Sequence, residues 1–122
     1  MDEFKVLQNK TLSSVDINDG KDEIVFTTAE GEKYKLYHSQ NCCESVLIED
    51  IEGDMADLIG NPILIAEEVE QVSEENEKVW SPSQTWTFYK LSTIKGSVTI
   101  RWLGESNGYY SESVDFIRID NE

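Results

Sequence analysis

The segment from His38 to Glu44, HSQNCCE, holds the residue types that metal sites and thiol enzymes use. It contains the single histidine and both cysteines of the chain. A structural zinc site needs more ligands, at separable spacing, than this segment offers. The simpler interpretation is a histidine with satisfied ring nitrogens beside buried thiols. A thiol- or metal-dependent enzyme centred on His38, Cys42 and Cys43 stays open as an alternative.

A second group of candidate residues combines aromatic side chains with cations in the C-terminal third of the chain. Aromatic and Arg side chains are typical anchors of binding interfaces. A small-molecule site for a nucleotide-like anion is therefore one hypothesis. The competing interpretation is that Trp86 and Phe88 belong to a second buried face. The candidate ligand-binding residues are Trp86, Lys90, Arg101, Tyr109 and Tyr110.

A third candidate surface is acidic. The chain carries 25 Asp and Glu against 10 Lys and Arg, a formal charge of -15. No Lys or Arg lies between Lys35 and Lys78, an interval that holds twelve acids. Phosphates would be repelled, so we expect no direct binding of nucleic acid. The acids either serve solubility or present a nucleic-acid-like surface to a basic protein. The predicted partner surface consists of Glu49, Asp50, Glu52, Asp54, Asp57, Glu67 and Glu68.

Other chemical motifs are missing from the sequence. It has no phosphate-cradling glycine loop, no HExxH, no GxSxG and no dinucleotide fingerprint. An EF-hand that began at Asp50 would need glycine and glutamate where Met55 and Asn61 stand. We therefore predict no catalytic residue, no metal and no cofactor, and an enzyme is the weaker hypothesis.

The bulk properties indicate one soluble domain over residues 1–122. A chain of 122 residues with 39% hydrophobic residues is long enough for one core. It has no apolar run of membrane-spanning length, and its first ten residues lack the apolar part of a signal peptide. Adjacent cysteines do not form an ordinary disulfide, which fits a reducing compartment. We expect a cytoplasmic protein that does not bind membranes.

Period-two alternation between turn residues predicts a mainly β or β-rich α+β fold. Its architecture is predicted as a single antiparallel sheet, a sandwich or a half-open barrel. One short helix is expected, with Asp54 as its N-cap and Gly60 at its end. Residues 1–10 are expected to be frayed or a short edge strand, and residues 70–83 a mobile acidic loop. The expected strands lie at 11–17, 23–28, 33–38, 46–51 and 63–69, with two consecutive hairpins over 84–116 and a last segment at 117–119.

The first hairpin of the 84–116 stretch is expected to turn at Lys95-Gly96. That register makes Tyr89, Leu91, Ile100 and Trp102 a core face, with Tyr89 opposite Trp102. On the other face it sets Lys90 directly against Arg101. Like charges at this distance repel, so the pair requires an anion. Either an acid of the same chain or a bound phosphate or carboxylate ligand would satisfy it.

Two further registers follow from turn chemistry. The second hairpin, with a bulged turn at Asn107-Gly108, is expected to place Phe116 opposite Ile100 and Val114 opposite Trp102. A three-residue loop around Gly31 is expected to set Phe26 opposite Leu36 and Ile24 opposite His38.

Two phrases of the sequence resemble a known group of proteins. They are YHSQNCCESVLIEDIEGDMADLIGNPI and TWTFYK followed by KGSVTIRWLGESNGYYSESVDF. Over roughly residues 23–116 the chain is similar to small uncharacterised proteins of phages and prophages of Gram-positive bacteria. That family carries no assigned activity or site, so no residue role is transferred.

The resemblance implies a setting. It favours a non-enzymatic accessory protein in the cytoplasm of a bacterial host, with a host or phage protein as partner. Small accessory proteins of this kind often block host enzymes, defence systems or their signals. The oligomeric state is left open.

Overall fold

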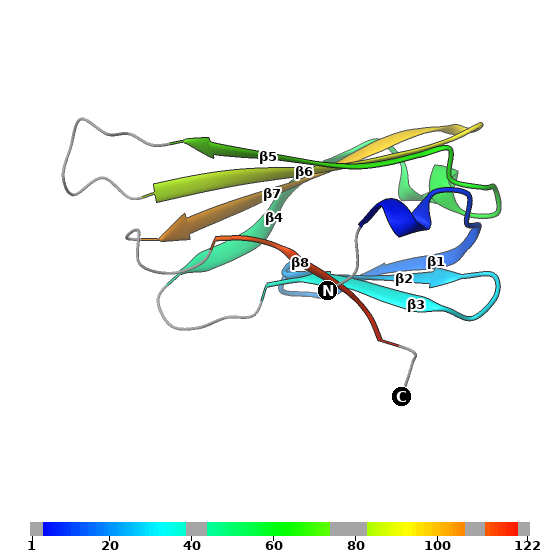
Figure 1. The fold of residues 1–122 in the computed structure, drawn as a ribbon, viewed down its shortest axis with the longest axis horizontal. Coiled ribbons are helices and arrows are strands. Elements are labelled where there is room, and N and C mark those ends of the chain that lie inside the picture. Colours follow the sequence, from blue (N-terminus) through cyan, green and yellow to red (C-terminus); the bar gives the residue numbers. More distant parts are fainter. Residues whose placement is uncertain (1–3, 39–43, 74–82, 107–111, 120–122) are drawn as a thin grey trace.

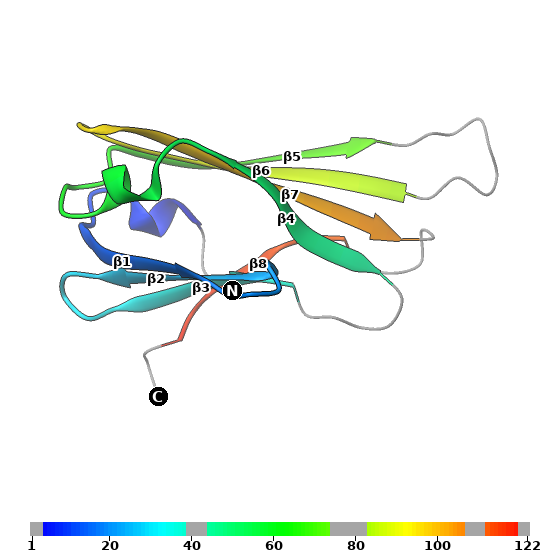
Figure 2. The same cartoon turned by 180° about the vertical axis from the view of Figure 1, so that it is seen from behind.

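Two four-stranded antiparallel sheets face each other across one hydrophobic core (Figures 1 and 2). The computed structural model describes residues 4–38, 44–73, 83–106 and 112–119. A mainly β fold was one prediction of the sequence, and the sandwich is the form it takes.

The first sheet has the strand order β1-β2-β3-β8 and the second the order β4-β7-β6-β5. The first sheet contains β1 (Leu12–Ile17), β2 (Glu23–Thr28), β3 (Lys33–Tyr37) and β8 (Asp115–Arg118). The second contains β4 (Ser45–Glu52), β5 (Ile65–Ser73), β6 (Ser83–Thr93) and β7 (Gly96–Ser106). Two 3-10 helices complete the described part, η1 (Phe4–Leu7) and η2 (Met55–Leu58).

Alternation along each strand decides which side chains enter the core. In β2 the residues Ile24, Phe26 and Thr28 are buried while their neighbours are partly exposed. In β7 the same period buries Ile100 and Trp102. The inner faces of both sheets therefore supply one shared core.

The N-terminal segment is part of this core, so the expectation of a frayed start or edge strand was wrong. Phe4 and Leu7 of η1 are buried. The Phe4 ring lies 4.7 Å from Tyr89 and 5.3 Å from Phe116, one from each sheet. Figure 1 shows η1 between the two sheets. The Phe4 side chain thus packs against residues of both sheets, although it belongs to no strand.

The predicted short helix is present as the single turn η2. The Asp54 side chain accepts a hydrogen bond from the backbone N–H of Ala56, as an N-cap does. Leu58 is buried, and Met55 and Ile59 pack against the core. So short a helix depends on this apolar contact for its stability.

The β6–β7 and β2–β3 hairpins both form, with registers shifted by two residues from the predicted ones. The β6–β7 turn consists of Ile94 and Lys95, so Tyr89 lies opposite Ile100 instead of Trp102. Thr93 fixes this turn, because its hydroxyl donates to the carbonyl of Asp57 and accepts from the Lys95 N–H. A shift of two keeps every side chain on its predicted face.

The β2–β3 hairpin repeats this pattern. Ile24 lies opposite Leu36 and Phe26 opposite Tyr34, whereas the prediction paired Phe26 with Leu36. The three-residue loop exists, but it is closed by Thr28, whose N–H donates to the Glu32 carbonyl at 2.8 Å. Gly31 adopts a φ of 94°, the left-handed conformation that suits glycine.

The second predicted hairpin of the 84–116 stretch is wrong in its pairing. β8 joins β3 in the other sheet, so Phe116 lies opposite Leu36 and not Ile100. The returning chain passes close to β7, since a Cβ placed on Gly104 would lie 2.5 Å from the Glu112 carbonyl oxygen. That approach leads the chain across the interior toward the first sheet. The turn at Asn107-Gly108 lies outside the described residues.

Residues 70–73 and 83, the two ends of the stretch 70–83 that was predicted to be a mobile acidic loop, belong to strands. β5 continues to Ser73, and β6 begins at Ser83. The two strands pair along their length, from Ile65 with Ser92 to Ser73 with Gln84. Residues 74–82 lie outside the described part of the chain.

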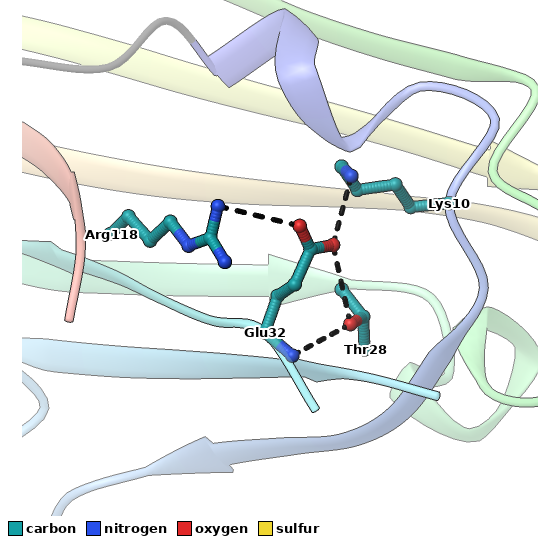
Figure 3. A network of polar contacts seen from close by, with 4 residues as sticks. All are labelled: Lys10, Thr28, Glu32 and Arg118. Atoms are coloured by element: carbon teal, nitrogen blue, oxygen red, sulfur yellow. Dashed lines mark hydrogen bonds and ion pairs between the residues drawn. The ribbon is translucent and has the colours of Figure 1, made fainter. Parts of the chain in front are cut away.

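A polar network ties three distant segments together (Figure 3). The Glu32 carboxylate, at the β2–β3 turn, lies 2.8 Å from Lys10 Nζ and 3.5 Å from Arg118 Nη1. Its backbone N–H donates to the Thr28 hydroxyl at 3.0 Å. The hydrogen bond that Lys10 donates to the Glu32 carboxylate raises the pKa of Lys10. The network links the segment before β1 to β8.

Candidate binding face

In the first half of β6, polar side chains face the interior of the sandwich and aromatic side chains face outward. Thr85 and Thr87 point into the sandwich and are buried, at 7% and 1% exposure. Trp86 and Phe88 point outward and are only partly covered. A strand that served the core alone would place its aromatic residues inside, where burial stabilises them most.

Cross-strand pairing extends these aromatics into a continuous apolar strip. Leu47 of β4 lies opposite Leu103 of β7, which lies opposite Trp86. Phe88 follows Trp86 by two residues on the same face and lies opposite Val69 of β5. We call these five side chains the apolar stripe; it crosses all four strands of the sheet.

Arg101 lies beside the stripe and is held by acids of its own chain. Its Nε and Nη2 lie 2.9 and 2.7 Å from Glu49 Oε2, and its Nη2 lies 3.5 Å from Asp50. Its guanidinium stands 5.5 Å from the centre of the Trp86 ring, a cation–π contact. The hydrogen bond that Arg101 donates to the Glu49 carboxylate raises the pKa of Arg101.

A β-bulge makes this contact possible. The pairing of β4 with β7 slips between Ile48 and Asp50, which inserts Glu49 as an extra residue. Bulges re-aim side chains, and this one brings a second carboxylate to the outer face beside Asp50. The SVLIEDIE segment contains no Gly or Asn that would have marked the bulge in the sequence.

The structure brings together part of the predicted ligand site. Trp86 and Arg101 are in contact, and Lys90 is on the same face. Lys90 is opposite Thr99 and Glu67, however, so the predicted Lys90–Arg101 pair is wrong. The two-residue shift of the turn is the cause. Tyr109 and Tyr110 lie outside the described residues.

The anion required by Arg101 comes from the same chain, which was the first of the two predicted alternatives. The hollow beside it, lined by Asp50, Glu52, Phe88, Thr99 and Arg101, has a volume of about 50 Å³. Small-molecule sites are typically several hundred cubic ångströms. Arg101 is already paired with acids of its own chain, and the hollow beside it is small. Neither feature favours a nucleotide-like ligand here.

The predicted acidic surface surrounds the same sheet on three sides. Glu49, Asp50 and Glu52 lie on β4, at one edge. Glu67 and Glu68 lie on β5, at the opposite edge. Asp54 and Asp57 lie at η2, in the connection between these strands. The acids thus frame the sheet on three sides and do not form one continuous patch.

Some of these acids have structural contacts. Asp54 caps η2. Glu68 accepts a hydrogen bond from the Tyr89 hydroxyl at 2.8 Å. Glu52 and Glu67 are exposed on the outer face, in line with Thr99 and Lys90 between them. These two are the members of the predicted surface best placed to meet a partner.

A separate cleft of about 270 Å³ lies where the two sheets meet along β4. Its walls combine isoleucines with one cation and two acids that belong to the Arg101 cluster. The backbone N–H of Ile48 donates to the Lys21 carbonyl at 2.8 Å and closes its floor. The lining residues are Ile17, Lys21, Ile48, Glu49, Asp50 and Ile51.

The only histidine lies in the interior with both ring nitrogens engaged. His38 Nδ1 lies 2.7 Å from the Ser113 carbonyl oxygen, which can only accept, so this nitrogen carries a proton. Nε2 lies 2.7 Å from Glu44 Oε2, and a further proton is shared there. The side chains are 3% and 0% exposed. Cys42 and Cys43 lie outside the described residues, so the thiol hypothesis is not tested.

A buried carboxylate that sequence reasoning missed lies at the same end of the interior. Glu112 accepts hydrogen bonds from Thr85, at 2.7 Å, and from Ser106. Together with His38 and Glu44 these residues form what we call the polar end of the core. The signal for it was the phase of Thr85, which matches the buried positions Tyr89 and Leu91.

Within the described ranges, no three His, Cys, Asp or Glu side chains gather closely enough to hold a metal ion. The helices of the described part are too short to cross a membrane.

The fold and its outer face define a β-sandwich domain with a partly exposed apolar stripe on one outer face, framed by acids. Residues 5–116 match the model of a family described as a domain of unknown function, DUF7448, and the chain belongs to this family. No curated protein and no solved structure shows significant similarity to the chain.

Proposed function

We propose that the protein is a non-enzymatic binding protein that acts on a basic protein partner through its acidic surface. The acids that frame the β4-β7-β6-β5 sheet carry this proposal. A phage or prophage accessory protein that inhibits a host factor, such as a defence component, is the setting suggested by the sequence resemblance. The acidic surface would then imitate nucleic acid toward its target.

The charge distribution supports this function over simple solubility. The predicted acids are grouped on β4, η2 and β5, whereas the outer face of the first sheet mixes the acids Asp16, Glu23 and Asp115 with Lys33 and Lys35. Grouped charge of one sign raises the rate of encounter with an oppositely charged partner. A purely solubilising charge needs no such grouping.

The test is the salt dependence of complex formation in lysate of a Gram-positive host. The protein is immobilised, and the captured proteins are compared between about 50 mM and about 500 mM salt, where the screening length falls several-fold. Capture is expected to weaken steeply, and added duplex DNA is expected to compete for the same target. A complex that survives high salt unchanged contradicts the acidic mechanism.

Two matched double variants distinguish the effect of charge on the acidic frame from the effect of the net charge of the protein. Glu52→Gln/Glu67→Gln removes two charges from the acidic frame. Asp16→Asn/Glu30→Gln removes two exposed charges from the first sheet and its turn. Only the first variant is expected to weaken capture. Equal losses in both variants would indicate that net charge, and not the frame, attracts the partner.

A further inference from the structure

The outward aromatics of β6 are not explained by folding. Trp86 and Phe88 occupy outer positions while Thr85 and Thr87 occupy inner ones. Burial in the core would stabilise these aromatics more than their partly exposed outer positions do. A sequence that places its aromatics on the solvent side of a central strand therefore points to a second contact for them.

The outer face of the first sheet is a natural comparison within the same molecule. Its centre carries Val25 and Thr27 of β2 and Lys33, Lys35 and Tyr37 of β3. Lys35 is satisfied locally, 3.1 Å from Glu23 and 4.6 Å from the Tyr37 ring centre. This face has no apolar row that spans four strands, unlike the stripe of the second sheet.

The stripe has the organisation of a protein interface. Apolar and aromatic side chains occupy the centre, and Leu47 at its end is 42% exposed. Glu52 and Glu67, with Lys90 between them, and Asp50 beside Arg101 border it on one side, and Glu105 borders it on the other. Interfaces of this kind bury an aromatic and Arg centre inside a polar rim.

The contacts of Arg101 prepare the stripe for binding. Glu49 holds the guanidinium in a two-nitrogen contact, and the guanidinium in turn covers one face of Trp86. Both groups of the central pair are thus ordered before a partner arrives. Less conformational entropy is lost when pre-ordered side chains bind.

Charge selects the kind of occupant. A second copy of the chain would bring another -15 charge and another acidic rim against this one. Nucleic acid and anionic lipid surfaces would be repelled in the same way. A polypeptide with apolar side chains flanked by Lys or Arg matches both the stripe and its rim.

We infer that the outer face of the β4-β7-β6-β5 sheet is the docking surface, on which the apolar stripe receives apolar side chains of a partner protein and the acidic rim receives its flanking cations. This inference rests on the proposed function and assigns it to one face. The rim provides salt-sensitive attraction, and the stripe provides the contact that persists after docking.

The experiment combines a defined probe with site-specific crosslinking. The probe is a nine-residue peptide that alternates Lys and Leu, compared with peptides that alternate Lys and Ser or Glu and Leu. Binding is followed by NMR shifts of backbone amides in β6 and β7. The Lys/Leu peptide is expected to bind about tenfold more tightly than either other peptide, a difference of about 1.4 kcal/mol.

A photoreactive phenylalanine analogue is then placed at Leu47 or at Asp16 in the full chain. Both positions are exposed, on edge strands and on outer faces, but of different sheets. In host lysate a crosslink to another protein is expected from Leu47 and not from Asp16. It is expected to be lost in Phe88→Thr/Leu103→Thr and kept in the matched control Val25→Thr/Ile117→Thr. Thermal unfolding of each variant verifies that it is folded.

The possible failures are distinct. Equal binding of the Lys/Ser peptide overturns the role of the stripe and leaves the acidic function in place. Equal binding of the Glu/Leu peptide contradicts the acidic function and leaves the stripe in place. A Leu47 crosslink to a second copy of the chain, crosslinks from Asp16 alone, or the absence of both Lys/Leu binding and a Leu47 crosslink overturns the docking surface.

Discussion

The inner and outer faces of the β4-β7-β6-β5 sheet reverse the usual distribution of polarity near the start of β6. Inside, Thr85 and Ser106 bind the buried carboxylate of Glu112. Outside, Trp86 and Phe88 lie in the apolar stripe. The same alternation that builds the core thus delivers hydroxyls to the interior and aromatics to the surface.

This difference separates two tasks. A buried polar group stabilises the fold only while its hydrogen bonds are complete, and its loss is costly. A partly exposed aromatic contributes less to folding than a buried one and can contribute much to an interface. Inner-face substitutions should therefore change stability strongly, and outer-face substitutions should change it little.

The largest effect is expected for His38→Ala at the polar end of the core. The change removes a ring that is bonded to Glu44 and to the Ser113 carbonyl, and it leaves a carboxyl group buried at 0% exposure. Removing one partner of a buried hydrogen bond typically costs about 1–3 kcal/mol, and more where a charged group is involved. Urea unfolding at neutral pH measures the loss.

The control replaces both members of the pair. His38→Phe/Glu44→Leu fills similar volume without a buried charge, so it should be less destabilised than His38→Ala. If the double change costs as much as the sum of both single changes, the two side chains act independently and the polar end is not a coupled unit.

The next effect appears at alkaline pH. Burial, reinforced by the neighbouring carboxylate of Glu68, raises the pKa of Tyr89 above its usual value of 10.0. The folded state therefore keeps a proton that the unfolded state releases. Stability is complete below about pH 10 and falls above it by up to about 1.4 kcal/mol per pH unit from this group.

Tyr89→Phe isolates that contribution. The variant lacks the hydrogen bond to Glu68, so a modest loss of about 1 kcal/mol is expected near neutral pH. Its unfolding free energy should then fall less steeply than that of the wild type above about pH 10. Parallel pH curves for the two proteins would show that the buried phenol does not titrate with unfolding.

A matched pair of smaller changes tests the inner face directly. Within the described structure Thr87 Oγ1 is buried without a hydrogen-bond partner, whereas Thr85 Oγ1 donates to Glu112. Thr87→Val should stabilise the protein by about 1 kcal/mol, and Thr85→Val should destabilise it by about 1–2 kcal/mol. The same substitution, two residues apart on one strand, is thus expected to have opposite signs in thermal unfolding. Equal signs would contradict the assigned hydrogen bonds.

Alternation alone was enough to predict much of this arrangement. The faces of β2, β6 and β7 follow from period two, and an error of two residues in register leaves them unchanged. The contact of Trp86 with Arg101 followed from the same faces. Alternation did not predict which residues pair across β6 and β7, because the position of the turn depends on the tertiary contact of Thr93 with Asp57.

Other features had no local signal. The transfer of β8 to the first sheet depends on the close approach of Glu112 to Gly104, which no spacing reveals. Glu112 is one of 25 acids, and only its tertiary partners mark it as buried. The bulge at Glu49 has no glycine to announce it. Long-range contacts therefore determine both the composition of the polar end of the core and the pairing of Arg101 with acids of its own chain.

The smallest change in stability is expected for Glu49→Gln on the outer face. The Glu49–Arg101 contact is solvent-exposed, and exposed ion pairs contribute little to folding. The unfolding midpoint should match that of the wild type, while the indole NMR signal of Trp86 should broaden or shift because the guanidinium above it is no longer held. A fall in the midpoint as large as that of Thr85→Val would make the outer face a structural element like the inner one. An unchanged midpoint with a changed Trp86 signal would confine the role of this contact to ordering the exposed stripe.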